Sequence, residues 1–114
     1  MGHVNHAVYF TYFEQCRLMC WRELTGSLHP HGRVILARAE CDYRSQARFG
    51  DELEVGMAIG DVGRSSFGLR YAITHVAEGR LVAEGSTVMV AFDYEAGASM
   101  PLSEATRALL HRFR

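Results

Sequence analysis

The feature that most constrains the fold is the apolar segment that opens the chain, MGHVNHAVYFTYFEQCRLMCWREL (residues 1–24). From Val4 to Leu24 the apolar residues cover most of a helical wheel, so the pattern predicts a helix that is buried on nearly all sides. The polar exceptions Thr11, Gln15 and Arg22 recur at helical spacing and predict one narrow edge that reaches water or a partner. Some later part of the chain must therefore wrap this helix.

Composition restricts the class of protein. A length of 114 residues gives room for one domain, residues 1–114, and a hydrophobic content of 48% is typical of a globular protein with a real core. A formal net charge of −1 gives no reason to expect nucleic acid or an anionic membrane as the main partner. The apolar segment is too short and too charged for a membrane span, and the chain opens without a signal-peptide pattern, so we expect a cytoplasmic protein.

Cysteine and histidine spacing gives little support for a metal site. Three cysteines, with Cys16 and Cys20 four residues apart on the apolar helix, lack the pattern of a disulfide framework or a zinc site, so we interpret them as small core residues. His3 and His6 are three residues apart and could share a face, but no third ligand stands at a recognisable spacing. The prediction is that the protein holds no metal.

The rest of the chain has strand periodicity. Asn5 is a candidate N-cap of the helix, which Thr25-Gly26-Ser27 ends. Beyond a loop, four alternating segments predict consecutive antiparallel strands joined by short hairpins, over residues 35–44, 52–59, 66–74 and 81–94. A short amphipathic helix follows Pro101 and Ser103. The sum is an α+β architecture in which an antiparallel sheet curls around one long helix.

The alternation also predicts which strand faces are buried. The fourth strand is apolar on both faces, which indicates a central position or a subunit contact. In the other three strands one residue in two is expected to face the core. These residues are Ile35, Ala37, Ala39, Cys41 and Tyr43 in the first, Leu53, Val55, Met57 and Ile59 in the second, and Phe67, Leu69, Tyr71 and Ile73 in the third.

Several motifs in this layout resemble one family. GHVNHAVYFTYFEQCR (residues 2–17), YRSQARFGDELEV (43–55), GRSSF (63–67) and AEGSTVMVAFD (83–93) stand in the same order as in the 4-hydroxybenzoyl-CoA and Tol-Pal-associated branch of hotdog-fold thioesterases. The resemblance implies a hotdog fold and hydrolysis of an acyl-CoA thioester. It also implies a homodimer or homotetramer with each active site at a subunit interface. No cofactor is implied, because CoA enters as part of the substrate.

The resemblance places catalysis at the start of the long helix. Free backbone N–H groups and the positive dipole end of a helix suit the oxyanion that develops in acyl transfer. The donor position falls at His6, whose imidazole could also hold the attacking water, and substrate-binding positions fall at the helix start. These are Gly2, His3, Val4, Asn5 and Tyr9.

The family pattern also includes an aspartate three residues before Gly2 and a strand leading into it, and neither is in this sequence. Glu14 is the nearest substitute carboxylate. Its structural alternative is a helix-edge acid paired with Arg17. From this we expect a chain that is impaired in hydrolysis or that relies on another residue.

A second group of candidates lies at the predicted hairpin turn of Arg64, Ser65 and Ser66. Arginine forks suit phosphate oxygens and hydroxyls suit pantetheine amides, so these residues are candidate CoA contacts, although most such residues are ordinary surface. Arg107, Arg112 and Arg114 could extend this basic rim.

Other function classes stay open to different degrees. A non-catalytic hotdog module that binds acyl-CoA, or that serves as an assembly partner, is the alternative to the thioesterase. A hydratase on the same fold would need its own His/Asp pair, for which no motif is evident. No nucleophile elbow is present, so a Ser/His/Asp hydrolase is unsupported.

Overall fold

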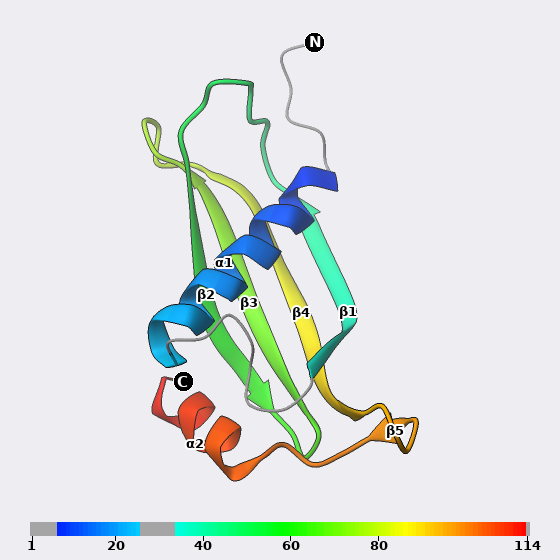
Figure 1. The fold of residues 1–114 in the computed structure, drawn as a ribbon. Helices are drawn as coiled ribbons and strands as arrows, with labels where there is room; N and C mark the ends of the chain where they lie inside the picture. Colours follow the sequence, from blue (N-terminus) through cyan, green and yellow to red (C-terminus); the bar gives the residue numbers. More distant parts are fainter. Residues whose placement is uncertain (1–6, 26–33, 114) are drawn as a thin grey trace.

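A computed structural model describes residues 7–25 and 34–113, and shows one helix lying across one face of an antiparallel sheet (Figure 1). This arrangement confirms the predicted α+β architecture. Helix α1 spans Ala7–Thr25, and the strands are β1 (Val34–Tyr43), β2 (Leu53–Val62), β3 (Ser66–His75), β4 (Leu81–Asp93) and the short β5 (Ala98–Ser99), followed by helix α2 (Glu104–Arg112).

The strand order of the sheet is β1-β4-β3-β2, with β5 paired to the end of β4. The predicted hairpins β2–β3 and β3–β4 are confirmed, and β4 is central. The predicted hairpin between the first two strands is wrong, because β1 pairs with β4 instead. The connection of residues 44–52 is long enough to carry the chain across the ends of β4 and β3 before β2 begins.

The face of the sheet toward α1 carries the core. Phe67, Leu69, Tyr71 and Ile73 of β3 are all buried, as the alternation predicts. Their partners on β2, including Val55 opposite Ile73, share this face and are partly buried. The 2-residue period therefore located the inner face of both strands correctly.

The predicted inner face of β1 is partly wrong. A bulge between Leu36 and Arg38 adds Ala37 to the strand, so residues on its two sides alternate out of phase. Ile35 consequently pairs with Val90 on the face away from α1, while Leu36 pairs with the buried Met89. Leu36 itself is 50% exposed, because α1 crosses the sheet diagonally and leaves that end of β1 uncovered (Figure 1).

The prediction that the long helix is buried on nearly all sides is also wrong for the single chain. Tyr9, Phe13 and Trp21 are buried against the sheet, whereas Phe10 and Met19 are 39% and 63% exposed. One sheet covers only one side of a helix, so the apolar residues on the other side of α1 stay uncovered.

Helix α2 matches its prediction. The Ser103 side chain caps its first turn by accepting a hydrogen bond from the Thr106 N–H at 3.1 Å. Leu110 and Thr106 are buried, and the helix packs near β2 (Figure 1).

A close approach of α1 to the sheet is made at Phe13. Its ring stacks on Tyr71 with centroids 4.6 Å apart and planes at 16°. Gly85, the cross-strand partner of Tyr71 on β4, completes the surface under that ring. A Cβ added to Gly85 would lie 2.6 Å from Phe13 Cε2 and would also collide with the Glu40 carbonyl oxygen of β1.

We therefore expect Gly85→Ala to lower the free energy of unfolding by about 1–3 kcal/mol, the usual cost of overpacking a core. Urea unfolding at neutral pH measures it. Gly56→Ala on β2 is the matched control, because a Cβ there meets nothing within 4 Å. Equal effects of the two substitutions would show that the approach of Phe13 does not require glycine.

Candidate active site

Tyr9 is the predicted site residue nearest the start of α1 whose side chain the structure describes. It is buried, and its ring lies 5.5 Å from the ring of Tyr43 and 6.1 Å from that of Tyr12, measured between centroids. Burial raises the pKa of its hydroxyl, and a backbone hydrogen bond from Ala47 acts in the opposite direction. Tyr9 thus joins α1, the end of β1 and the connection that follows β1.

The other predicted residues of this end are Gly2, His3, Val4, Asn5 and His6, and all of them lie outside the described residues. Their roles remain predictions.

Glu14 lies exposed on α1, about a turn and a half beyond Tyr9. The structural alternative for it, an ion pair with Arg17, is absent among the described residues. Arg17 Nη1 points to the sheet instead and donates to the Tyr71 hydroxyl at 3.4 Å. That hydroxyl is 2.9 Å from Thr87 Oγ1, which forms a buried polar contact in the core. A catalytic role for Glu14 stays a prediction.

The hairpin that contains Arg64, Ser65 and Ser66 is fixed through its backbone. The Arg64 carbonyl accepts from the Leu102 N–H at 2.9 Å and from Arg107 Nη2 at 3.0 Å. Arg107 Nη2 also donates to the Gly63 carbonyl at 3.0 Å. Arg107 therefore holds the hairpin, while the Arg64 side chain is exposed and Ser65 and Ser66 are partly buried.

The two groups of predicted site residues lie at opposite ends of the sheet. Tyr9 contacts Tyr43 at one end, whereas Trp21 stacks on Phe67, next to Ser66, with centroids 6.4 Å apart at the other. From Tyr9 to Trp21 the α-helix rises by twelve residue steps, which span about 18 Å. One chain does not bring the start of α1 and the Arg64 hairpin together.

The three cysteines are only partly buried, so the prediction that they are core residues is only partly confirmed. Cys16 Sγ lies 4.0 Å from Cys20 Sγ, and burial raises the pKa of the Cys16 thiol to about 12, which disfavours the reactive thiolate. A cavity of about 280 Å³ beside α1 is lined by both cysteines and by Tyr12, Met19 and Val55. Over residues 7–25 and 34–113 no cluster of three or more His, Cys, Asp or Glu side chains could hold a metal, and no helix could cross a membrane.

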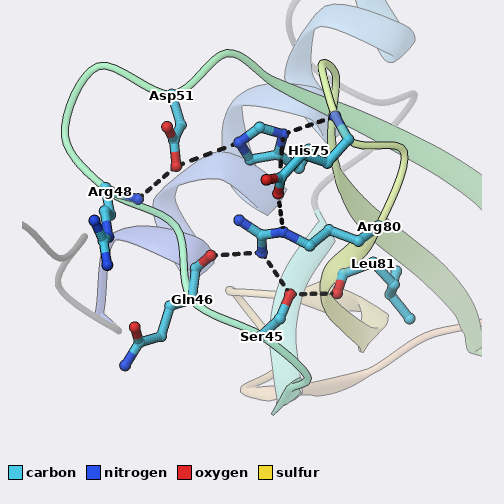
Figure 2. Close-up of polar contacts among 8 residues, drawn as sticks. Ser45, Gln46, Arg48, Asp51, His75, Arg80 and Leu81 are labelled. Carbon is cyan, nitrogen blue, oxygen red and sulfur yellow. Dashed lines mark hydrogen bonds and ion pairs between the residues drawn. The ribbon is translucent and has the colours of Figure 1, made fainter.

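Sequence reasoning missed a polar cluster beside the connection 44–52. A cavity of about 600 Å³ is lined there by Ser45, Gln46, Arg48, Asp51, His75, Glu78 and Arg80 (Figure 2). His75 is only 7% exposed and lies between the carboxylates of Asp51 and Glu78. The one available signal was the β3 alternation, which continues through Ile73 to place His75 on the inner face.

The sequence and the fold are similar to those of known proteins. The family described as the thioesterase-like superfamily matches residues 1–110. The uncharacterized protein YsmA of Bacillus subtilis is 31% identical over 112 residues, which cover 96% of this chain and 76% of YsmA.

Two solved structures extend the comparison. A thioesterase from Thermus thermophilus, complexed with coenzyme A and Zn, is 33% identical, with a TM-score of 0.83 over 98% of this chain and 82% of that one. A predicted thioesterase from Bacillus stearothermophilus is 26% identical, with a TM-score of 0.86 over 98% and 84%. The hotdog fold expected from the sequence motifs is thereby confirmed.

The polar cluster predicts how stability responds to acid. The pKa of Asp51 is lowered, chiefly because its carboxylate accepts a hydrogen bond from the Arg48 N–H at 2.7 Å. A group whose pKa is lower in the folded state stabilises the protein above its unfolded pKa, and this contribution is lost as the pH falls through the folded pKa. Asp51→Asn should therefore destabilise the chain at pH 7, and the difference from wild type should shrink below about pH 4.

Urea unfolding at pH 7, 5 and 3 measures this difference. Asp42→Asn, at an exposed position of β1, is the control and should cost less at pH 7. A difference between wild type and Asp51→Asn that stays constant down to pH 3 would contradict the prediction.

Proposed function

Because the chain belongs to the thioesterase-like superfamily, we propose that it hydrolyses acyl-CoA thioesters to the free acid and CoA. The observation that carries this proposal is the match to the Thermus thermophilus thioesterase, which is named as a complex with coenzyme A and is 33% identical over nearly all of this chain. The motif order further favours the 4-hydroxybenzoyl-CoA and Tol-Pal-associated branch.

The proposed chemistry takes place at the start of α1. Water attacks the thioester carbonyl carbon, its proton passes to a base, and the carbonyl oxygen becomes an oxyanion. The C–S bond then breaks as the carbonyl re-forms, and the CoA thiolate takes up the proton held by the base. The His6 N–H stabilises the oxyanion, and its imidazole holds the attacking water. Glu14 is the proposed carboxylate base on the exposed side of α1. Tyr9 and residues 2–5 line the acyl end of the site.

CoA binding is proposed for the hairpin of Arg64, Ser65 and Ser66. The exposed Arg64 guanidinium can pair with a phosphate of CoA, and Arg107 keeps the hairpin backbone in place. Since this hairpin lies at the far end of the sheet from Tyr9, we propose that the two groups meet across an interface between two chains of a homodimer or homotetramer.

The first test is CoA release from short-chain, long-chain and aromatic acyl-CoAs, followed with a thiol reagent. We expect turnover by the wild-type chain and a drop in kcat of about 10²-fold for both His6→Ala and Glu14→Gln, the usual contribution of a positioned acid or base. Circular dichroism checks that each variant is folded.

Gly56→Ala is the control for this test, because its added Cβ meets nothing within 4 Å. Full activity of Glu14→Gln would exclude Glu14 as the base, but it would not contradict the hydrolase function or the role of His6. Tight acyl-CoA binding without turnover by the wild-type chain would favour the binding module over the enzyme.

The second test separates the CoA end of the site from the acyl end. Arg64→Ala should raise the KM for acyl-CoA about tenfold, as expected for loss of a hydrogen bond to a charged group, and leave kcat nearly unchanged. The same substitution should not affect hydrolysis of an acyl-pantetheine thioester, which lacks the nucleotide. An equal effect on both substrates would remove Arg64 from nucleotide binding.

Mixing Arg64→Ala with His6→Ala chains then tests the shared interface. If each site takes the two residues from different chains, random exchange of subunits in a dimer makes about one quarter of all sites intact. The recovery is read as kcat/KM at low acyl-CoA concentration, where both parent variants are impaired. No recovery after verified subunit exchange would place both residues in a site within one chain.

A further inference from the structure

The polar cluster of Figure 2 ties the connection 44–52 to the β3–β4 hairpin at both of its ends. At the near end Arg80 Nη1 donates to Ser45 Oγ at 2.7 Å and to the Gln46 carbonyl at 2.6 Å. Ser45 Oγ in turn donates to the Leu81 carbonyl at 2.7 Å. Arg80 Nε donates to the Glu78 carboxylate, which holds the guanidinium in its orientation.

At the far end the contact is made by His75. The Glu78 N–H donates to His75 Nδ1 at 3.1 Å, so Nδ1 is the acceptor and the ring proton lies on Nε2. Nε2 faces Asp51 Oδ2 at 3.5 Å. The Val76 N–H adds a hydrogen bond of 3.0 Å to the carbonyl of Glu52.

Between these two anchored ends lies Ala47, which is 1% exposed. Its backbone hydrogen-bonds to Tyr9, the buried tyrosine of the first turn of α1. The β3–β4 hairpin therefore fixes the position of the connection, and the connection in turn fixes the start of α1, where the proposed chemistry takes place. Phe49, in the turn at residues 48–51, is 94% exposed. Apolar packing therefore contributes little to the position of this turn, and the polar contacts hold the turn in place.

We propose that Arg80 and His75 are positioning residues of the active site. Their contacts hold the connection 44–52 in place. Through the hydrogen bond of Ala47 to Tyr9, the connection then holds Tyr9 and the start of α1 in the geometry required for attack of water on the thioester. The proposal rests on the proposed thioesterase function, because it assigns these residues to the same site. Neither residue touches the substrate, so the effect of changing them passes through Tyr9.

The test is a double-mutant cycle with Arg80→Met and Tyr9→Phe, read on acyl-CoA hydrolysis. Arg80→Met should lower kcat about tenfold with little change in KM, since a small misplacement of catalytic groups mainly affects the transition state. Tyr9→Phe, which removes the hydroxyl bonded to Ala47, should cause a similar loss. In the Tyr9→Phe background Arg80→Met should then cause less than a twofold further loss.

Two further variants guard the interpretation. Arg44→Met is the matched control, because Arg44 lies in the same connection but its side chain pairs with Glu84 of β4, at 3.1 Å from Nε. Its kcat should stay within twofold of wild type. Arg80→Lys keeps a charged donor at this position and should recover part of the kcat lost in Arg80→Met, which would exclude a simple failure to fold.

Hydrogen exchange measured by mass spectrometry gives a readout that needs no activity. Arg80→Met should speed amide exchange about tenfold in the peptide covering residues 44–52, and Arg44→Met should not. Unchanged exchange in Arg80→Met, or losses of kcat that multiply in the double variant, would overturn the proposal. Absence of turnover by the wild-type chain would instead overturn the hydrolase function and the catalytic part of this inference, while exchange would still decide whether these contacts hold the connection in place.

Discussion

The stack of Phe13 on Tyr71 is the contact on which the rest of the structure depends. It sets the distance of α1 from β3, and it is possible only because β4 presents Gly85 where every other residue would carry a Cβ. Around it the same helix face buries Tyr9 toward one end of the sheet and Trp21 toward the other. The Phe13 stack over Gly85 thus sets the height of the helix above the sheet, and the burial of Tyr9 and Trp21 sets its direction.

The direction of α1 decides where functional groups are placed. Because the helix crosses the sheet diagonally, its start lies beside the end of β1 and its other end lies toward the β2–β3 hairpin (Figure 1). This geometry separates the proposed acyl end from the Arg64 hairpin by about the length of twelve helical residues, or about 18 Å. It also leaves Phe10 and Met19 exposed on the opposite side of α1. Both facts favour a site completed by a second chain, as the family resemblance implied.

Local periodicity predicted much of the fold, and its failures have identifiable causes. The inner face of β3 and the start of α2 after Ser103 follow from spacing and residue type alone, since each depends on neighbours in sequence. The face of β1 was predicted correctly from Ala39 to Tyr43 but wrongly at Ile35, because the bulge at Ala37 inverts the alternation and leaves no clear mark in the sequence. The burial of α1 was overestimated because a wheel that is apolar all round does not say which molecule covers each side.

The candidate site was predicted less completely than the fold, and the polar cluster explains why. Ser45, Asp51 and Arg80 are polar or charged residues outside the strands, where such residues are usually ordinary surface, and His75 is the last residue of β3. Their contacts exist because β1 pairs with β4 and the chain must then cross the sheet to reach β2, which brings residues 45–51 against the β3–β4 hairpin. A connection that spans strand ends exposes backbone groups that need partners, and Arg80 supplies one to the Gln46 carbonyl. His75, at the end of β3, faces the Asp51 carboxylate of the same connection. The positioning role proposed for Arg80 and His75 arises from the order of the strands, so no local sequence pattern marks it. This holds even though both residues contact the connection that reaches the start of α1, where function is expected.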